Sequence, residues 1–297
     1  MKELVIVSGK GGTGKTSISA ALAFIALHKI LVDCDVDAAN LHLISGAVLN
    51  ESHEFTAGFE PHIDKSRCTA CGKCTDLCRF GAITNGVLTS PFNCEGCGVC
   101  SFNCPAQAIQ MQNKKAGQWF ISDTRLGRLV HAELGLSVEN SGKLVNKVRQ
   151  EAKKIAAAEQ ISLIITDGPP GIGCPAIAAL SGADLALAVV EPSITGIHDL
   201  TRLVDLVSHF NLPLTVCINK SNLHPENTRN LIAWCQQNAI AVAGQLPYSD
   251  IFRHAVQDGK TVMEMPSNED VKQPLIELWI NLLNRLAIID QSKKETK

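Results

Sequence analysis

The chain has 297 residues, a length that suits two domains or one large α/β domain with an insertion. Its hydrophobic fraction of 45% and charged fraction of 19% are typical of a packed globular protein and exclude a disordered chain. The formal charge is −2, which excludes a nucleic-acid-binding protein that depends on a global excess of basic residues.

The first predicted element is a buried strand at residues 4–7, and a helix is expected from about Gly14 to His28. Residues 9–16 lie between them and read Gly-Lys-Gly-Gly-Thr-Gly-Lys-Thr, which matches the phosphate-loop pattern at every defined position. In such a loop, backbone amides and the helix N-terminus face the phosphates. Lys15 should then reach the β- and γ-phosphates, and Thr16 should hold Mg²⁺. The alternative, a chance glycine-rich turn, is disfavoured by eight matching residues in this context. The residues expected to contact the nucleotide are Gly11, Gly12, Thr13, Gly14, Lys15 and Thr16.

Acidic residues follow two of the predicted strands. Asp33 and Asp35 come after the strand at residues 30–32, and Asp167 ends a strand that begins at Leu163. The carboxyl ends of parallel strands lie in one row, so these three carboxylates should converge beside the phosphate loop, where Mg²⁺ and a hydrolytic water would lie. The alternative for each of them is a helix cap or a turn residue, and that is the reading we keep for Asp37.

Eight of the twelve cysteines lie between Cys68 and Cys104. The pattern C-x₂-C-x₂-C-x₃-C starts at Cys68 and again at Cys94, so the segment is an internal repeat with a period of 26 residues. This is the pattern of bacterial two-cluster ferredoxins, in which the fourth cysteine of each run binds the other cluster. Paired Cys₄ zinc sites fit it poorly, because they need two pairs of ligands. We expect Cys68, Cys71, Cys74 and Cys104 to hold one [4Fe–4S] cluster, and Cys94, Cys97, Cys100 and Cys78 to hold the other.

Beyond this segment, short apolar runs alternate with helical patterns. The runs lie at residues 163–165, 185–190, 214–218 and 240–246, and the helices near residues 175–181, 197–209 and 226–238. Strands buried on both faces and joined by helices indicate a doubly wound, mainly parallel α/β sheet. We expect an ATPase domain at residues 1–58 and 112–297, interrupted at residues 59–111 by a small α+β ferredoxin-like domain.

The last predicted helix spans residues 269–289 and has a broad apolar face, as in a helix that packs on a sheet. A membrane-surface helix is the alternative, but it would carry more basic residues. No apolar run is long enough to span a bilayer, and the N-terminus resembles neither a signal nor a transit peptide. We therefore expect a cytoplasmic protein without a membrane span.

Lys10 adds a further feature to the loop, because a lysine follows its first glycine. In this respect the chain resembles the MinD/ParA ATPases with a deviant Walker A loop, whose relatives include Mrp-type iron–sulfur carriers and the nitrogenase iron protein. Residues 33–41 resemble the first switch of that family, and residues 167–173 resemble its second switch. The resemblance covers most of residues 1–50 and 115–265. With the cysteine-rich segment, the chain is similar to MinD-superfamily ATPases that contain an inserted ferredoxin domain.

The resemblance implies roles for several residues. Lys10 would reach across an ATP-bound dimer into the partner's site, and Asp35 would orient the attacking water. Asp33 and Asp167 would hold the magnesium shell, and Asn219 would contact adenine. Cys174 lies where the nitrogenase iron protein keeps a ligand of its bridging cluster, but no cysteine between Cys104 and Cys174 supplies the second ligand. The alternative for Cys174 is a transient metal site across a dimer, with one thiolate from each subunit. We interpret Cys217 and Cys235 as small core residues and Cys34 as a small residue at a strand end.

An ATP site and two redox clusters in one chain indicate that nucleotide state and cluster chemistry are coupled. Our leading hypothesis is a Mg²⁺-dependent ATPase, active as a homodimer or as a heterodimer with a paralogue. It would deliver electrons or a metal cluster to an unidentified redox or metallocofactor-assembly protein. One alternative is a positioning ATPase of the MinD/ParA kind with structural or redox-sensing clusters. Another is a plain ferredoxin-like carrier with a vestigial nucleotide site, against which the intact Lys15, Thr16 and Asp35 argue.

Overall fold

The computed structural model describes residues 1–85, 87–88, 90–135, 140–266 and 268–295, with the backbone alone at residues 290–295. It divides into two compact units. Unit 1 comprises residues 1–52, 119–133 and 141–297, and unit 2 comprises residues 53–118 and 134–140. No helix in the described ranges is long and apolar enough to cross a membrane.

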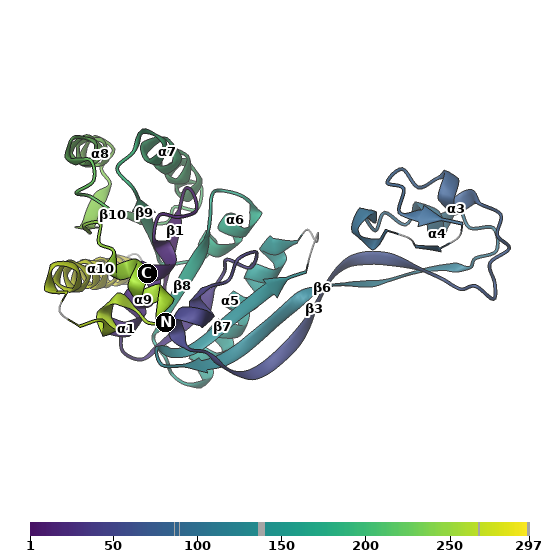
Figure 1. Ribbon diagram of the computed structural model, residues 1–297, viewed down its shortest axis with the longest axis horizontal. Helices are drawn as coiled ribbons and strands as arrows, with labels where there is room; N and C mark the ends of the chain where they lie inside the picture. Colours follow the sequence, from purple (N-terminus) through teal and green to yellow (C-terminus); the bar gives the residue numbers. More distant parts are fainter. Residues whose placement is uncertain (86, 89, 136–139, 267, 296–297) are drawn as a thin grey trace. The chain divides into compact units, whose positions relative to one another are not determined.

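A nine-stranded sheet in the described part of the chain has the order β11-β10-β9-β1-β8-β2-β7-β6-β3 (Figure 1). The strands are β1 (Lys2–Ser8), β2 (Lys29–Asp33), β3 (Val48–Ile63), β6 (Ile109–Thr124), β7 (Gly127–Leu134), β8 (Leu163–Pro170), β9 (Leu185–Val190), β10 (Leu214–Ile218) and β11 (Ala241–Gln245). β1 pairs in parallel with β8 and β9, and β2 pairs in parallel with β7 and β8. The mainly parallel α/β sheet expected from the sequence is therefore confirmed.

Helices cover both faces of the sheet because successive side chains of a strand point to opposite faces. Leu4 and Ile6 of β1 belong to one apolar cluster with α1 (Lys15–Ile25) and α10 (Glu269–Glu295). Against the other face lie α5 (Ser141–Ala158), α6 (Cys174–Leu180) and α7 (Ile194–Ser208). The remaining helices of unit 1 are α2 (Leu41–Ser45), α8 (Pro225–Gln237), α9 (Ile251–Gln257) and the 3₁₀ turn η2 (Val262–Glu264).

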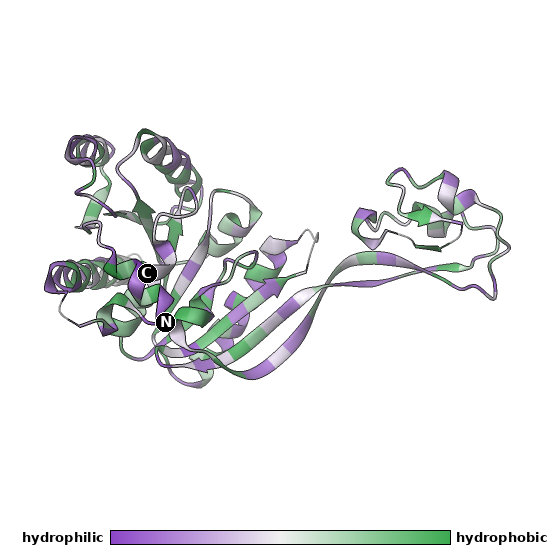
Figure 2. Ribbon diagram, viewed as in Figure 1, coloured by the Kyte–Doolittle hydropathy of each residue, from purple (hydrophilic) through white to green (hydrophobic). Residues whose placement is uncertain are grey.

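The central strands are almost wholly buried, whereas β3 is mostly exposed and half of its residues are polar. Every residue of β9 is buried, but β3 keeps a single buried residue along its length. Figure 2 shows the same contrast, with β9 in hydrophobic green and long stretches of β3 in hydrophilic purple. A strand buried on both faces is therefore rich in apolar residues, and a strand that faces solvent need not be.

The structure differs from the sequence-based expectations in four elements, β3, β6, α5 and β7. β3 and β6 are strands of 16 residues each, where we expected little regular structure after Phe59, and the expected boundaries at 58/59 and 111/112 fall inside them. The α5 helix was not expected, although its buried Leu144, Val148 and Ala152 lie at helical spacing. β7 was missed as well, because it reads as one short apolar run after a polar stretch.

Unit 2 is built from two similar halves. One contains α3 (Lys73–Asp76) and β4 (Ile83–Thr84), and the other contains η1 (Pro91–Asn93) and α4 (Val99–Phe102). β4 pairs antiparallel with β5 (Val87–Leu88). The period of 26 residues seen in the sequence is a structural period too. Asp64 N donates to Ala108 O at 2.8 Å, and the equivalent Ser90 N donates to Ala82 O at 3.2 Å, so each half binds the other.

Candidate functional site

The phosphate loop joins β1 to α1 at the edge of the sheet where β8, β9 and β10 also end. Gly12 and Gly14 have φ angles of 80° and 89°, in the left-handed region that favours glycine. A Cβ atom at Gly14 would lie 2.4 Å from Asn219 Nδ2, so this position excludes a side chain for steric reasons as well. The buried hydroxyl of Thr13 has no hydrogen-bond partner among the described residues. An unpartnered donor in such a loop fits a site for phosphate oxygens.

Asp167 connects the loop to β8. Lys15 Nζ donates to Asp167 Oδ1 at 2.9 Å, and Thr16 Oγ1 donates to Asp167 Oδ2 at 2.7 Å. Ser19, one turn further along α1, donates to Asp167 Oδ1 at 2.8 Å. Burial alone favours the neutral amine, but the charge of Asp167 outweighs it, and the pKa of Lys15 is raised. The structure thus brings together Lys15, Thr16 and Asp167, and adds Ser19, which the sequence analysis did not single out.

Asp33 lies beside Asp167 in the sheet but has different partners. The two residues are paired in register between β2 and β8. Asp33 accepts backbone N–H groups from Asp35, Asn40 and Leu41 at 3.0, 3.2 and 3.1 Å, so its carboxylate organises the segment that leads into α2. Burial, with the nearby Asp167 carboxylate, raises the pKa of Asp33 to about 7. A metal role for Asp33 would therefore have to compete with these backbone contacts.

Asp35 is half-buried at the end of the same strand. Burial raises its pKa, and the Lys15 charge opposes that shift. Its side chain is thus within electrostatic reach of Lys15 in the phosphate loop.

Asn219 and Lys220 follow β10 and contact the loop directly. Asn219 Nδ2 donates to Thr13 O at 2.7 Å, and Lys220 Nζ donates to Gly12 O at 3.2 Å. Both residues line a cavity of about 240 Å³ that also includes Tyr248. The other lining residues are Gly14, Ser17, Pro247, Ser249, Asp250, Phe252 and Arg253. The sequence analysis placed Asn219 at the adenine but missed the segment around Tyr248, because it lies far away in the chain and matches no motif.

Lys10 lies on the exposed side of the loop. Its Nζ donates to Thr195 Oγ1 at 3.3 Å and lies 3.6 Å from the Glu191 carboxylate, both in the same chain. Glu191 was also missed, although its place directly after β9, at the carboxyl end of a strand, was the available signal.

The eight clustered cysteines line two cavities in unit 2. One is lined by Cys68, Cys71, Cys74 and Cys104. The other is lined by Cys78, Cys94, Cys97 and Cys100. Each cavity takes three cysteines from one half of the repeat and one from the other half. None of the eight thiols forms a disulfide.

The surroundings of these thiols repeat as well. Cys78 Sγ accepts the Ala82 N–H at 3.3 Å, and Cys104 Sγ accepts the Ala108 N–H at 3.3 Å. Such hydrogen bonds stabilise thiolates that ligate iron. In the described ranges, no three His, Cys, Asp or Glu side chains are spaced to hold a single metal ion. The two sets of four cysteine thiols are a donor set of the kind that holds an iron–sulfur cluster.

The other cysteines lie apart from these cavities. Cys34 and Cys217 are fully buried, and burial raises the pKa of Cys217 to about 12. Cys235 is also buried, and its pKa is raised to about 11. Cys217 and Cys235 are core residues, as expected, and Cys34, directly after β2, is buried too. Cys174 is exposed and is the first residue of α6.

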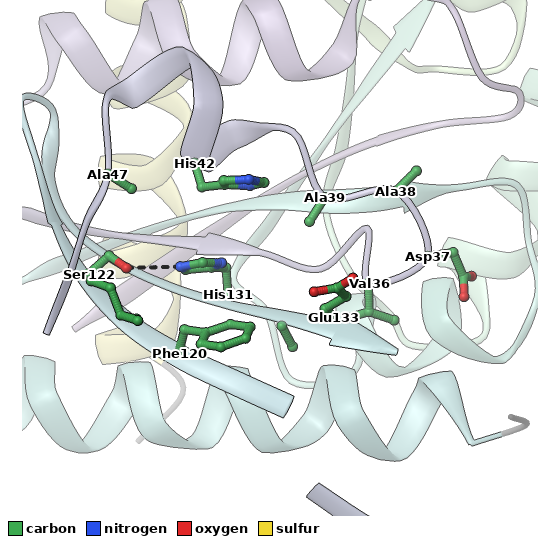
Figure 3. Close-up of a pocket in the computed structure, with 12 residues that line it drawn as sticks. Val36, Asp37, Ala38, Ala39, His42, Ala47, Phe120, Ser122, His131 and Glu133 are labelled. Carbon is green, nitrogen blue, oxygen red and sulfur yellow. Dashed lines mark hydrogen bonds between the residues drawn. The ribbon is translucent and has the colours of Figure 1, made fainter. Parts of the chain in front are cut away.

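A cavity of about 450 Å³ lies beside residues 36–39, which follow Asp35. Figure 3 shows His42 and His131 stacked in parallel over Phe120, and the ring centroids of the two histidines are 5.4 Å apart. Ser122 Oγ and His131 Nε2 form a hydrogen bond of 3.0 Å. Burial, with the neighbouring His42, lowers the pKa of His131 to about 4. The imidazole is therefore neutral at pH 7.

Comparison with known proteins agrees with this geometry. Residues 4–262 match the family model described as CobQ/CobB/MinD/ParA nucleotide binding domain. The chain is 36% identical to Uncharacterized protein MJ0578 of Methanocaldococcus jannaschii over 231 residues, which cover 76% of this chain and 80% of that protein. It is 37% identical over 57 residues, 19% of this chain, to pyruvate synthase subunit PorD of Methanothermobacter marburgensis, 70% of which is covered.

Among solved structures, the chain is similar in fold to the septum site-determining protein MinD of Pyrococcus horikoshii complexed with Mg-ADP. The TM-score is 0.58 at 17% identity, over 95% of each chain. The family match extends over most of the chain and includes the phosphate loop, Asp33, Asp35, Asp167 and Asn219. The chain therefore belongs to the CobQ/CobB/MinD/ParA family of nucleotide-binding proteins.

Proposed function

We propose that the protein is a Mg²⁺-dependent ATPase that dimerises on ATP and carries two [4Fe–4S] clusters, and that it delivers electrons or a cluster to a partner in metallocofactor assembly. The observation that carries this proposal is the grouping of eight cysteines into two interleaved sets of four, in a chain whose other unit belongs to a nucleotide-binding family. The similarity to a subunit of pyruvate synthase supports a redox role.

The nucleotide would lie along the loop, with its phosphates over residues 11–16 and its base in the cavity of Asn219 and Tyr248. Thr16 and Asp167 would hold Mg²⁺, because their hydroxyl and carboxylate oxygens, which meet at 2.7 Å, are ligands of the kind that Mg²⁺ prefers. Once bound, it would neutralise phosphate charge. Lys15 would leave Asp167 and bind the phosphates instead. Asp35 would orient the attacking water. Asp33 would hold the segment that carries Asp35 in place.

In unit 2, the eight cysteines would act as thiolate ligands, and the N–H groups of Ala82 and Ala108 would stabilise two of the sulfurs. When bound, the clusters supply one-electron chemistry. The protein holds them through cysteines from both halves of the repeat. Loss of one cysteine should therefore affect one cluster directly and leave the other set of four complete.

The first test is metal content after anaerobic purification. We expect about eight irons and eight acid-labile sulfides per chain. Cys68→Ala and Cys94→Ala should each lower the iron content to about half, because each belongs to a different set. Stoichiometric zinc without the broad visible absorbance of an iron–sulfur protein would contradict the proposal.

The second test is hydrolysis. ATP turnover should need Mg²⁺ and Lys15, and the specific activity should rise with protein concentration because the active species is a dimer. Lys10→Ala should bind ATP but not form the closed dimer. A Lys10→Ala variant that dimerises and hydrolyses ATP like the parent would show that Lys10 does not act across the dimer.

A further inference from the structure

Glu191 occupies a position between two lysines at the edge of the phosphate loop. It follows β9 directly and forms an ion pair with Lys220, while Lys10 Nζ lies 3.6 Å from its other carboxylate oxygen. Lys220 Nζ in turn donates to Gly12 O at 3.2 Å, so Glu191 is connected to the loop through both lysines. The proposed function assigns Glu191 no role in nucleotide binding or hydrolysis.

The backbone of Glu191 is held firmly. Val190 O accepts the Asn219 N–H at 2.8 Å, and Glu191 O accepts the Ser193 N–H at 2.8 Å. A Cβ atom at Gly196 would lie 2.2 Å from Glu191 O, so the first turn of α7 packs closely on this carbonyl. The carboxylate is therefore presented from a rigid support.

Lys10, by contrast, is held only by contacts at the surface. Its side chain is 37% exposed and the Glu191 side chain 19% exposed, so the contact is partly solvated. A partly exposed ion pair contributes little to stability, and a stronger anionic partner can displace it. The hydrogen bond from Lys10 to Thr195 is also on the surface, and at 3.3 Å it is long.

We propose that Glu191 is a positioning residue that holds Lys10 against its own chain and so competes with a partner subunit's nucleotide for this lysine. The inference rests on the proposed function, in which Lys10 acts across an ATP-bound dimer. Without nucleotide, the Lys10 ammonium pairs with Glu191 and Thr195. When a second, ATP-loaded copy approaches, its phosphates offer more negative charge than one carboxylate, and Lys10 transfers to them. Glu191 thus raises the ATP-loaded protein concentration at which dimers form.

The test compares Glu191→Gln with the parent. Glutamine keeps the shape and an acceptor for Lys220 but removes the charge. Self-association is measured by analytical ultracentrifugation with Mg²⁺ and a non-hydrolysable ATP analogue, at low and at high salt. We expect Glu191→Gln to associate at a concentration about 2–5-fold lower than the parent at low salt. The difference in association concentration between Glu191→Gln and the parent should be smaller at high salt, because salt screens a partly exposed ion pair.

Hydrolysis provides a second readout, which a purely structural effect would not reproduce. The protein concentration for half-maximal activity should fall in Glu191→Gln, while kcat of the assembled dimer stays the same. Asp205→Asn is the matched control, because it changes the net charge equally at an exposed position of α7. It should associate like the parent.

Two results would overturn the inference. Association of Glu191→Gln equal to that of the parent would show that Glu191 does not restrain Lys10, and weaker association would show that Glu191 supports the dimer instead. Lys10→Ala separates this failure from failure of the proposed function. If the parent associates no better than Lys10→Ala, Lys10 does not act across the dimer, so that part of the proposed function is wrong and this inference is wrong with it.

Discussion

Asp167 accepts hydrogen bonds from Lys15, Thr16 and Ser19 at 2.9, 2.7 and 2.8 Å. Lys15 and Thr16 could be named from the phosphate-loop motif, and Asp167 from its place at a strand end. Ser19 could not, because no motif position assigns it. It reaches Asp167 because α1 places it one turn beyond Lys15, on the same side of the helix.

The lowered pKa of His131 leads to a prediction about how the stability of the protein depends on pH. Its pKa is lowered from 6.5 to about 4, so the unfolded chain binds a proton that the folded chain does not over this range. As the pH falls from 6.5 to about 4, the free energy of unfolding should then decrease by about 1 kcal/mol per pH unit. Above pH 6.5, this histidine should not affect the free energy of unfolding. His131→Gln should remove this contribution, measured as the difference in urea unfolding between parent and variant from pH 7 to pH 4.5.

His42 offers the comparison for this prediction. It stacks on His131, but it is half-buried, and burial lowers its pKa while Glu133 opposes the shift. His42→Gln should therefore change the pH dependence less than His131→Gln. Parallel stability curves for the parent and His131→Gln across this pH range would show that His131 is protonated in the folded chain.

At the scale of elements, an ion pair connects β1 to two helices. Arg149 of α5 forms hydrogen bonds of 2.7 Å with both carboxylate oxygens of Glu3 in β1, and it donates to Ser181 O, directly after α6, at 2.8 Å. Both side chains are buried, and Lys153 contacts the same carboxylate from a position that is 36% exposed. Glu3 therefore has two cationic partners, Arg149, which is buried, and Lys153, which is partly exposed.

Arg149→Met should lower the free energy of unfolding by about 3–5 kcal/mol, because it leaves Glu3 buried beside a weaker partner. Lys153→Met, the matched control, should cost at most about 1 kcal/mol, since its pair is partly solvated. Chemical denaturation of both variants checks the difference. Equal losses would show that burial does not decide the strength of these contacts.

The repeat in unit 2 supports a second prediction at this scale. Gly96 has a φ angle of 65°, and a Cβ atom there would lie 2.4 Å from Phe59 O. Gly98, at φ 74°, has no atom that close. Gly96→Ala should therefore displace the loop that carries Cys94 and Cys97, whereas Gly98→Ala should cost only about 1 kcal/mol.

Iron content and visible absorbance check this prediction under anaerobic conditions. Gly96→Ala should lose up to half of the iron, because the Cys68 set is formed by the other loops, and Gly98→Ala should retain nearly all of it. Full iron in Gly96→Ala would show that the loop moves without loss of its ligands.

At the scale of the whole molecule, nucleotide state and cluster redox state should be linked. If ATP changes the cluster potential, reduction must change ATP affinity by the same free energy. A coupling of about 1–3 kcal/mol corresponds to a roughly 5–150-fold change in ATP affinity. The measurement is ATP affinity of the oxidised and the dithionite-reduced protein, with Cys68→Ala as a control that lacks one cluster. Equal affinities without a partner would place any coupling in the partner complex.

Much of the candidate site could be predicted from the sequence because its signals are local. The loop at residues 9–16, the two cysteine runs and the acidic strand ends each occupy a short contiguous segment with a recognisable spacing. The apolar strands were equally clear, since a strand buried on both faces admits few polar residues. The α5 helix also had a local signal, in the spacing of Leu144, Val148 and Ala152, and should have been predicted.

The tertiary structure alone decided the contacts that no sequence motif specifies. It placed Tyr248 beside Asn219, Glu191 beside Lys10, and the backbone amides of Asn40 and Leu41 on Asp33. It also made β3 and β6 long strands despite their polar sequences, because backbone hydrogen bonds between neighbouring strands do not depend on hydrophobic side chains. The sequence by itself determined which chemistry the chain carries, since loops and ligand runs are local. Which side chains meet around that chemistry is a property of the folded chain, because no local pattern specifies these contacts and segments as distant as those of Lys10 and Glu191 come together only when the sheet forms.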